Sequence, residues 1–200
     1  ALANRGIGYV ELRAVDVNPY SPIGIDEDTA GFLEVLALYC LLQDSPALLD
    51  AEQSIIEKNQ AEVVNRGRAP NAQIQEGDVK TPIEAWGKQY VTAMQPLAAL
   101  LDQCYATQLY SQALERMMAR LHEDDETLSA HMIADTIQHG GTWGFGSYMA
   151  QQHAHAYEQH LLRPETQTYF DEIAVQSIQQ QKQLEQAQGL SFADYVAQYR

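Results

Sequence analysis

The sequence predicts a mainly α-helical chain that begins with a single β-strand. Residues 7–13 (Ile-Gly-Tyr-Val-Glu-Leu-Arg) are rich in β-branched and aromatic residues and alternate in polarity, as residues of a half-buried strand do. After Pro22 the apolar residues recur at helical spacing instead. We therefore expect one N-terminal strand followed by about seven helices.

The expected helices begin at recognisable capping residues. Asp26 can cap the first, in which Phe32, Val35 and Leu42 lie on one apolar face. Thr81-Pro82-Ile83-Glu84 has the pattern of a capping box with Pro at the first helical position. The seven expected helices are 26–42, one from Ser45-Pro46, 81–104, 109–121, 128–139, 148–162 and 165–188, and a short final helix capped by Ser191 and Asp194 follows them.

Two glycine-containing stretches are expected to be irregular. Residues 65–79 contain Gly67, Pro70 and Gly77 and are typical of a loop. The pair Gly140-Gly141 is expected to end a helix, with Trp143 packed against the turn. This second stretch lacks the Lys and the spacing of a phosphate-binding loop.

The composition excludes some classes of function. Of the 200 residues 46% are hydrophobic and 20% are charged, which is typical of a globular protein. No run approaches the roughly eighteen apolar residues of a membrane span. The net charge of −15 disfavours partners with phosphate backbones or anionic lipid surfaces. Cys40 and Cys104 lie among apolar residues and are expected to be buried thiols of a cytoplasmic protein rather than a disulfide.

The strand itself carries a candidate site. Side chains alternate along a strand, so Glu11 and Arg13 share one face. A carboxylate is an oxygen ligand for Mg²⁺, and a guanidinium can fork onto phosphoryl oxygens, so the pair fits a site of phosphoryl transfer. A surface ion pair explains the same spacing.

A family resemblance favours the first explanation. The motif Arg-Gly-Ile-Gly-Tyr-Val-Glu-Leu-Arg at 5–13, Asp-Val-Asn-Pro at 16–19 and Ser-Pro-Ile-Gly-Ile at 21–25 resemble the motif late in the proteobacterial-type glutamate–cysteine ligases. The resemblance implies that the chain is the C-terminal part of such an enzyme, which uses ATP and Mg²⁺ to join the γ-carboxylate of glutamate to the amine of cysteine, the first step of glutathione synthesis. It also implies a parent enzyme of the α+β class, related to glutamine synthetase.

Matched by position, Glu11 would be a metal ligand for Mg²⁺. Arg13 would be a catalytic and ATP-binding residue that contacts the transferred phosphoryl group. Asp16 and Asn18 are expected to be turn residues that hydrogen-bond to the local backbone.

The resemblance also gives a domain organisation. Residues 1–25 would be the active-site strand and turn, and residues 26–200 a helical C-terminal region, together one domain. The family's other metal carboxylates and most of its substrate pocket precede this strand, and the chain starts abruptly before it. We therefore expect the chain to need an N-terminal remainder of the same enzyme as its partner and to have no ligase activity alone.

Other residues leave alternatives open. Arg66 and Arg68 could reach an anionic substrate or belong to a solvated loop. His131 and Asp135, four residues apart on one helix face, could hold zinc, although solvated or hydrogen-bonded histidines are the expected case. The rival to the ligase is an acidic helical module that binds a protein and has no catalytic activity.

Overall fold

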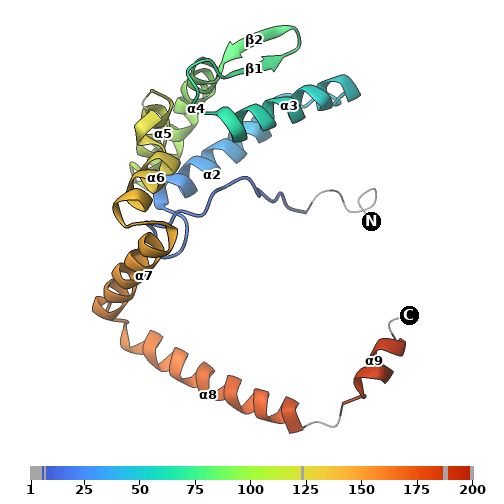
Figure 1. The fold of residues 1–200 in the computed structure, drawn as a ribbon, viewed down its shortest axis with the longest axis vertical. Helices are drawn as coiled ribbons and strands as arrows, with labels where there is room; N and C mark the ends of the chain where they lie inside the picture. Colours follow the sequence, from blue (N-terminus) through green and yellow to red (C-terminus); the bar gives the residue numbers. More distant parts are fainter. Residues whose placement is uncertain (1–5, 7, 123, 187–188, 199–200) are drawn as a thin grey trace. The chain divides into compact units, whose positions relative to one another are not determined.

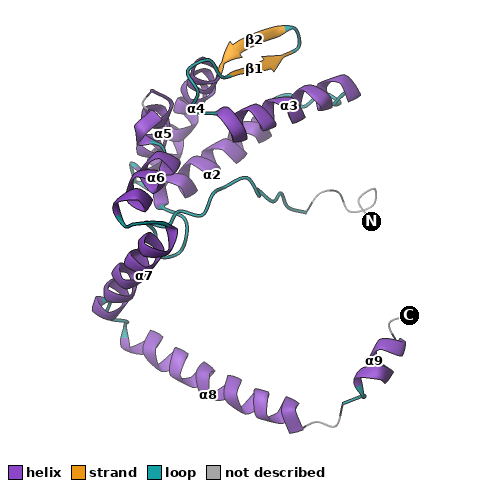
Figure 2. Ribbon diagram, in the orientation of Figure 1, coloured by secondary structure: helices purple, strands orange, loops and turns teal. Residues whose placement is uncertain are grey.

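The computed structural model describes residues 6, 8–122, 124–186 and 189–198. These residues form eight α-helices, one 3₁₀ turn and a two-stranded sheet (Figures 1 and 2). The predicted helical class is confirmed. The elements are α2 (Glu27–Leu42), α3 (Asp50–Arg66), β1 (Gln73–Glu76), β2 (Val79–Pro82), α4 (Ile83–Tyr105), α5 (Leu109–His122), η1 (Asp124–Glu126), α6 (Leu128–Gln138), α7 (Thr142–Gln159), α8 (Pro164–Gln186) and α9 (Phe192–Gln198).

The chain divides into two compact units, Ala1–His153 and Ala154–Arg200, with the boundary inside α7. The predicted organisation into residues 1–25 and 26–200 concerns function and stays a prediction. None of the described helices has both the length and the apolar character that crossing a membrane requires.

The hydrophobic core of the first unit lies between α2, α4 and α5. Val35 of α2, Met94 and Ala98 of α4 and Leu114 of α5 are at most 2% exposed. Around them pack half-buried residues such as Phe32, because the apolar stripes of the three helices face one another. This three-helix core supports the segments that precede α2 and follow α5.

Carboxylates cap two of the core helices. Asp26 accepts a hydrogen bond from the backbone N–H of Thr29 at 2.7 Å, which confirms the predicted cap of α2. Asp102, near the end of α4, accepts from the backbone N–H groups of Tyr110 and Ser111, both at 3.0 Å. The carboxylate of Asp102 thereby accepts hydrogen bonds from free N–H groups in the first turn of α5, although it belongs to a different helix.

A β-hairpin replaces the loop that was predicted over residues 65–79. Strands β1 and β2 pair antiparallel, from Gln73 opposite Pro82 to Glu76 opposite Val79, and Gly77 takes a φ of +56° in the turn. Asn59 of α3 joins the hairpin by donating to the carbonyl of Gln75 at 2.7 Å and accepting from its N–H at 2.8 Å. The loop prediction was wrong because the two strands are short and mostly polar.

The predicted N-terminal strand does not form among residues 8–13, which have no regular secondary structure; residue 7 lies outside the described residues. A strand needs a neighbour to take up its backbone hydrogen bonds. No other strand of the described chain pairs with this segment, since the sheet consists of β1 and β2.

Three local predictions need correction. Helix α3 begins at Asp50, not at Ser45-Pro46. Helix α4 begins after Pro82 without a side-chain cap, because Thr81 belongs to β2. Cys40 and Cys104 are free thiols as expected, but both are exposed and not buried.

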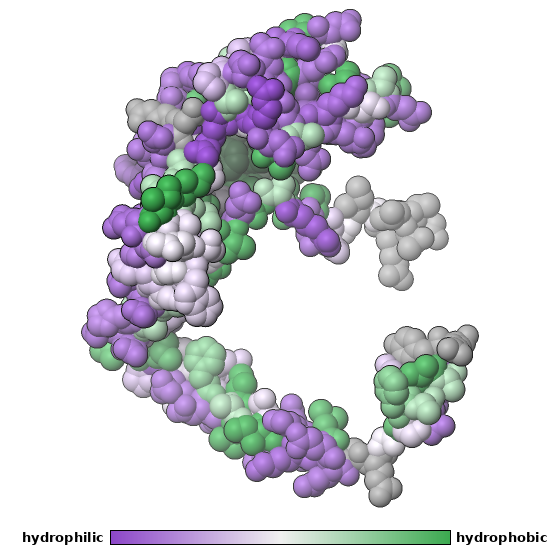
Figure 3. Space-filling view, viewed as in Figure 1, coloured by the Kyte–Doolittle hydropathy of each residue, from purple (hydrophilic) through white to green (hydrophobic). Residues whose placement is uncertain are grey.

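The second unit contains the end of α7 together with α8 and α9. Ser191 accepts a hydrogen bond from the N–H of Asp194 at 3.2 Å, which confirms the cap of the last helix. Helix α8 has no buried residue. Apolar side chains lie open on its surface (Figure 3), and those that are at least 41% exposed are Tyr169, Phe170, Ile173, Val175, Ile178 and Leu184.

Candidate functional site

The turn between the N-terminal segment and α2 is held by Asn18, a buried polar residue. Its side chain accepts from the N–H of Tyr20 at 2.9 Å and donates to Asp26 at 2.8 Å, and its own N–H donates to the carbonyl of Gly24 at 2.8 Å. Gly24 has a φ of +80°, a conformation that favours glycine. The structure therefore confirms Asn18 as a turn residue and links the turn to the cap of α2.

Tyr20 anchors this turn to the helices that follow the core. Its hydroxyl donates to Asp135 of α6 at 2.5 Å, and its ring packs against Phe145 of α7 with centroids 5.8 Å apart. Burial, together with the hydrogen bond to Asp135, raises the pKa of Tyr20 to about 12, so the hydroxyl stays protonated. His153 adds a contact of 2.7 Å to the carbonyl oxygen of Pro19.

Upstream of this anchored turn lies the predicted site pair. Arg13 Nη2 donates to Glu11 Oε2 at 2.9 Å, with the Arg13 and Glu11 side chains 82% and 54% exposed. An ion pair as exposed as this contributes little to stability, because water competes with both charges. A ligand can therefore replace either partner of this ion pair with little loss of free energy.

Two more arginines, Arg66 and Arg68, lie at the end of α3. Gly67 follows Arg66, and a Cβ there would lie 2.6 Å from the carbonyl oxygen of Val63, so this close turn requires glycine. The N–H of Ala69 then donates to the carbonyl of Arg66 at 2.8 Å, which fixes the path of the chain through Arg68.

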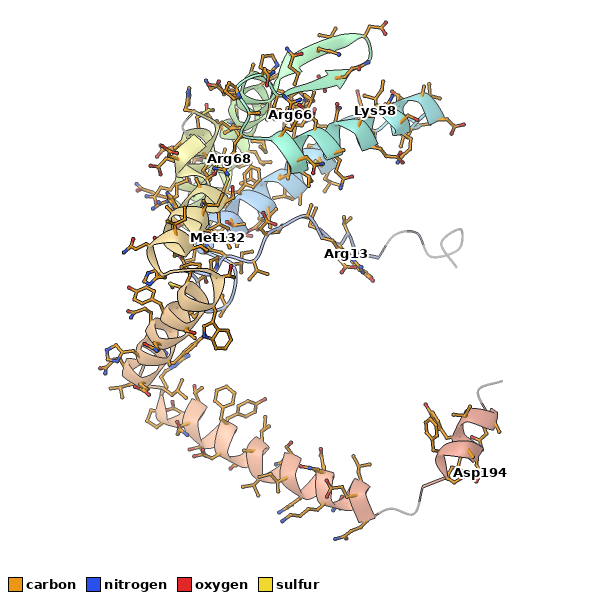
Figure 4. All side chains as sticks on the ribbon, in the orientation of Figure 1. Arg13, Lys58, Arg66, Arg68, Met132 and Asp194 are labelled. Carbon is orange, nitrogen blue, oxygen red and sulfur yellow. The ribbon has the colours of Figure 1, made fainter. Side chains whose placement is uncertain are left out.

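The structure brings these arginines and Arg13 to one cavity of about 800 Å³. Arg13 and Asp16 line it from the N-terminal segment, Arg66 and Arg68 from the end of α3, and Ser129 from α6. Figure 4 labels the three arginines, with Lys58 farther back along α3. The volume of the cavity falls within the range of roughly 300–1,000 Å³ that is typical of small-ligand sites. The alternative of a ligand-facing role for Arg66 and Arg68 thus gains a physical basis.

The charges of the cavity differ from those of the chain. Three arginines and one aspartate line it, although the whole chain carries a net charge of −15. Arg66 contacts Glu62 at 3.7 Å and donates to Asn71 at 2.8 Å. Such a lining favours an anionic group.

The other predicted candidates serve the fold. Asp135 accepts the hydrogen bond of Tyr20, and the His131 ring stands edge-on to the same tyrosine, with centroids 6.5 Å apart. Among the described residues no group of three or more His, Cys, Asp and Glu could hold a metal ion. Gly140 and Gly141 have positive φ and end α6 as predicted, but Trp143 is 86% exposed and does not pack against them.

No local pattern marks Tyr20 as an anchor, because its partner Asp135 is 115 residues away. The sequence also does not indicate that Arg13 lines the same cavity as Arg66 and Arg68, because this depends on the positions of the N-terminal segment and the end of α3 in the fold. Only the Asn-Pro turn at 18–19 was a local hint that the segment reverses direction.

Comparison with known proteins gives a consistent result. The family model for glutamate-cysteine ligase matches residues 1–63. The glutamate–cysteine ligase of Pseudomonas fluorescens strain Pf-5 is 36% identical over 201 aligned residues, and that of Azotobacter vinelandii is 35% identical. Both alignments cover all of this chain but 38% of the relative, so the chain spans somewhat over a third of the length of the curated relatives it matches.

A solved structure agrees with the sequence comparisons. The crystal structure of the Francisella tularensis glutamate–cysteine ligase in complex with AMP superposes with a TM-score of 0.78 at 25% sequence identity. It covers 100% of this chain and 39% of that one. The chain is thus similar over its whole length to a part of the glutamate–cysteine ligases, the family that the motif at 5–25 resembles.

Proposed function

We propose that the chain is the C-terminal part of an ATP-dependent glutamate–cysteine ligase and contributes one wall of its active site. The observation that carries the proposal is the cavity in which Arg13, from the segment that matches the family model, meets Arg66 and Arg68. The names of the relatives and the AMP bound to the Francisella tularensis structure support a nucleotide-using ligase.

The proposed reaction has two steps. A γ-carboxylate oxygen of glutamate attacks the terminal phosphorus of ATP, the bond to ADP breaks, and an acyl phosphate forms. The cysteine amine then attacks the acyl carbon, phosphate leaves with the bonding electrons, and the amine gives up a proton. Both steps develop negative charge on phosphoryl oxygens, which cationic donors stabilise.

In this scheme Arg13 is the catalytic and ATP-binding residue of the chain. Its guanidinium is 82% exposed and bound to the carboxylate of Glu11 alone among the hydrogen bonds and ion pairs of the described residues. A planar fork of N–H donors fits phosphoryl oxygens in pairs. Arg13 would therefore leave Glu11 and bind the transferred group.

Glu11 would supply one oxygen ligand to Mg²⁺, whose charge neutralises the phosphates when it is bound. An exposed carboxylate fits this role, since Mg²⁺ keeps several waters and takes only one or two carboxylates besides phosphate oxygens. Among the described residues no group of three or more His, Cys, Asp and Glu could hold a metal ion, so in this scheme phosphate oxygens, water and the remaining part of the enzyme would complete the coordination.

The proposed partner of the chain is the remaining part of the same enzyme, with glutamate, cysteine and ATP as the small-molecule substrates in the cytoplasm. The apolar side chains left open on α8 are a surface that such a partner would cover, because exposed apolar area of this kind marks contact sites. The alternative hypothesis is a freestanding interaction module. In that case a protein partner would bind the same apolar surface of α8, and the cavity would have no role.

The test compares two proteins: this chain alone, and the product of the whole reading frame that encodes it. Release of ADP from ATP, dependent on both glutamate and cysteine, is expected from the longer product and not from the chain. In the longer product Glu11→Gln should raise the Mg²⁺ concentration needed for half-maximal turnover, with Lys58→Gln unchanged. A reading frame that starts directly before Ala1, or a Glu11→Gln variant with the wild-type Mg²⁺ requirement, would contradict the proposal.

A further inference from the structure

Two of the arginines that line the cavity beside the end of α3, Arg66 and Arg68, have no role in the proposed function. We infer that Arg68, assisted by Arg66 and Arg13, binds an oxyanion of a small ligand, a phosphate or a carboxylate group, in this cavity. The inference deepens the proposed function and rests on it, because Arg13 belongs to both.

Arg68 is the central residue of this inference. No hydrogen bond or ion pair of Arg68 occurs within the described part of the chain, although the protein has 27 acidic residues against 12 basic ones. An arginine that lines a cavity in so acidic a chain and remains unpaired has all its N–H donors available. Carboxylates and phosphates match this planar fork.

The two neighbouring arginines can add to the same ligand. Arg13 is held by Glu11 at 2.9 Å and Arg66 by Glu62 at 3.7 Å, and the two arginine side chains are 82% and 51% exposed. Pairs as exposed as these contribute little to stability, so a ligand oxyanion can replace them without a large loss.

The backbone that presents Arg68 is already fixed. Gly67 cannot be replaced without a contact of 2.6 Å to the carbonyl oxygen of Val63, and the N–H of Ala72 donates to the carbonyl of Ala69 at 2.9 Å. Binding therefore orders the Arg68 side chain and not the turn, which reduces the entropy lost on binding.

The remaining polar residues of the lining define the binding region. Asp16 repels an anion, whereas the Ser129 hydroxyl of α6 can donate to one. With three arginines against one aspartate, the formal charge of the lining is +2. The oxyanion is therefore expected on the arginine side, with Asp16 free to accept from a donor of the same ligand.

The test is a titration of the 200-residue chain by calorimetry at low ionic strength, with inorganic phosphate, AMP and L-glutamate as separate probes. We expect binding of at least one probe, and an affinity about tenfold lower in Arg68→Gln, the loss typical of one charge-assisted contact. Binding of phosphate and AMP would identify a phosphate site, and binding of glutamate alone a carboxylate site.

Lys58→Gln is the matched control. It removes the same charge from an exposed residue of α3 that does not line this cavity. The inference is overturned if none of the three probes binds, if Arg68→Gln binds like the wild type, or if Lys58→Gln weakens binding equally, which would indicate a general effect of net charge.

Failure of this inference can be told apart from failure of the proposed function. If Arg68→Gln binds normally while Glu11→Gln shifts the Mg²⁺ requirement of the longer protein, the ligase proposal stands without an Arg68 site. If Arg68→Gln loses binding while Glu11→Gln keeps the wild-type Mg²⁺ requirement, the oxyanion site stands and the ligase assignment of Glu11 falls.

Discussion

The N-terminal segment 8–15 and the core of α2, α4 and α5 belong to the same compact unit but are built in opposite ways. Tyr9 and Val10 are 81% and 82% exposed, whereas Val35 and Met94 are at most 1% exposed. The segment has no regular secondary structure, and the core consists of three capped or packed helices. The candidate ligand-binding charges lie on the exposed segment and beside it.

The difference shows that stability and binding chemistry lie in separate residues. Residues of the core pack against one another. Among the described residues, Glu11 and Arg13 form an ion pair with each other and with no third residue. The turn at 16–26 joins the two regions, because Asn18 and Tyr20 connect it to α2, α6 and α7. Three variants should separate the regions, and their effects on stability are expected to fall in the order given.

The largest effect on stability is expected from Met94→Ala in the core. Met94 is 1% exposed, so truncation removes buried contacts and leaves a cavity, at a cost of about 2–5 kcal/mol in the free energy of unfolding. Urea denaturation followed by circular dichroism measures the cost. Leu100→Ala, 54% exposed on the same helix, should cost less than about 1 kcal/mol, and equal costs would contradict the placement of the core.

A smaller effect is expected from Asp26→Ala at the joining turn. Burial raises the pKa of Asp26, but the hydrogen bonds from Thr29 and Asn18 and the charge of Arg120 outweigh it, so the pKa is lowered. A lowered pKa stabilises the fold above the unfolded value of 3.8, and this contribution is lost as pH falls through the folded value. The substitution should cost about 0.5–2 kcal/mol at neutral pH.

The difference between wild type and Asp26→Ala should therefore shrink as the pH is lowered below about 4. Denaturation curves at a series of pH values measure it. Asp44→Ala is the control, because Asp44 is exposed and has no hydrogen-bond or ion-pair partner among the described residues. A cost for Asp26→Ala that does not depend on pH would contradict the role given to its charge.

The helical core could be predicted from the sequence because its signals are local. The stripe at Phe32 and Val35 and the cap at Asp26 each lie within a few residues of the helix they define. Glu11 and Arg13 were singled out by the family resemblance, and the structure shows them as an exposed ion pair, which their spacing alone also explains. Their roles toward ATP and Mg²⁺ stay predictions.

What the sequence could not provide depends on distant partners. The segment 8–13 has the composition of a strand, but strand formation needs a neighbouring strand, and the described chain has none for it. The hairpin at 73–82 was missed because Gln73, Gln75 and Glu76 lack the apolar alternation that marks a strand. The cavity at Arg68 is lined by residues 13–16 and 60–69, two segments about fifty residues apart in sequence, and no local pattern indicates that they share a cavity.

The smallest effect on stability and the most direct test both concern Arg13. In the product of the whole reading frame, Arg13→Ala is expected to lower glutamate- and cysteine-dependent ADP release about a hundredfold, since it removes a donor to the transferred phosphoryl group. The same variant should change the free energy of unfolding by less than about 0.5 kcal/mol, because the side chain is 82% exposed. Wild-type turnover in Arg13→Ala, or a loss of turnover that follows a loss of stability, would contradict the account.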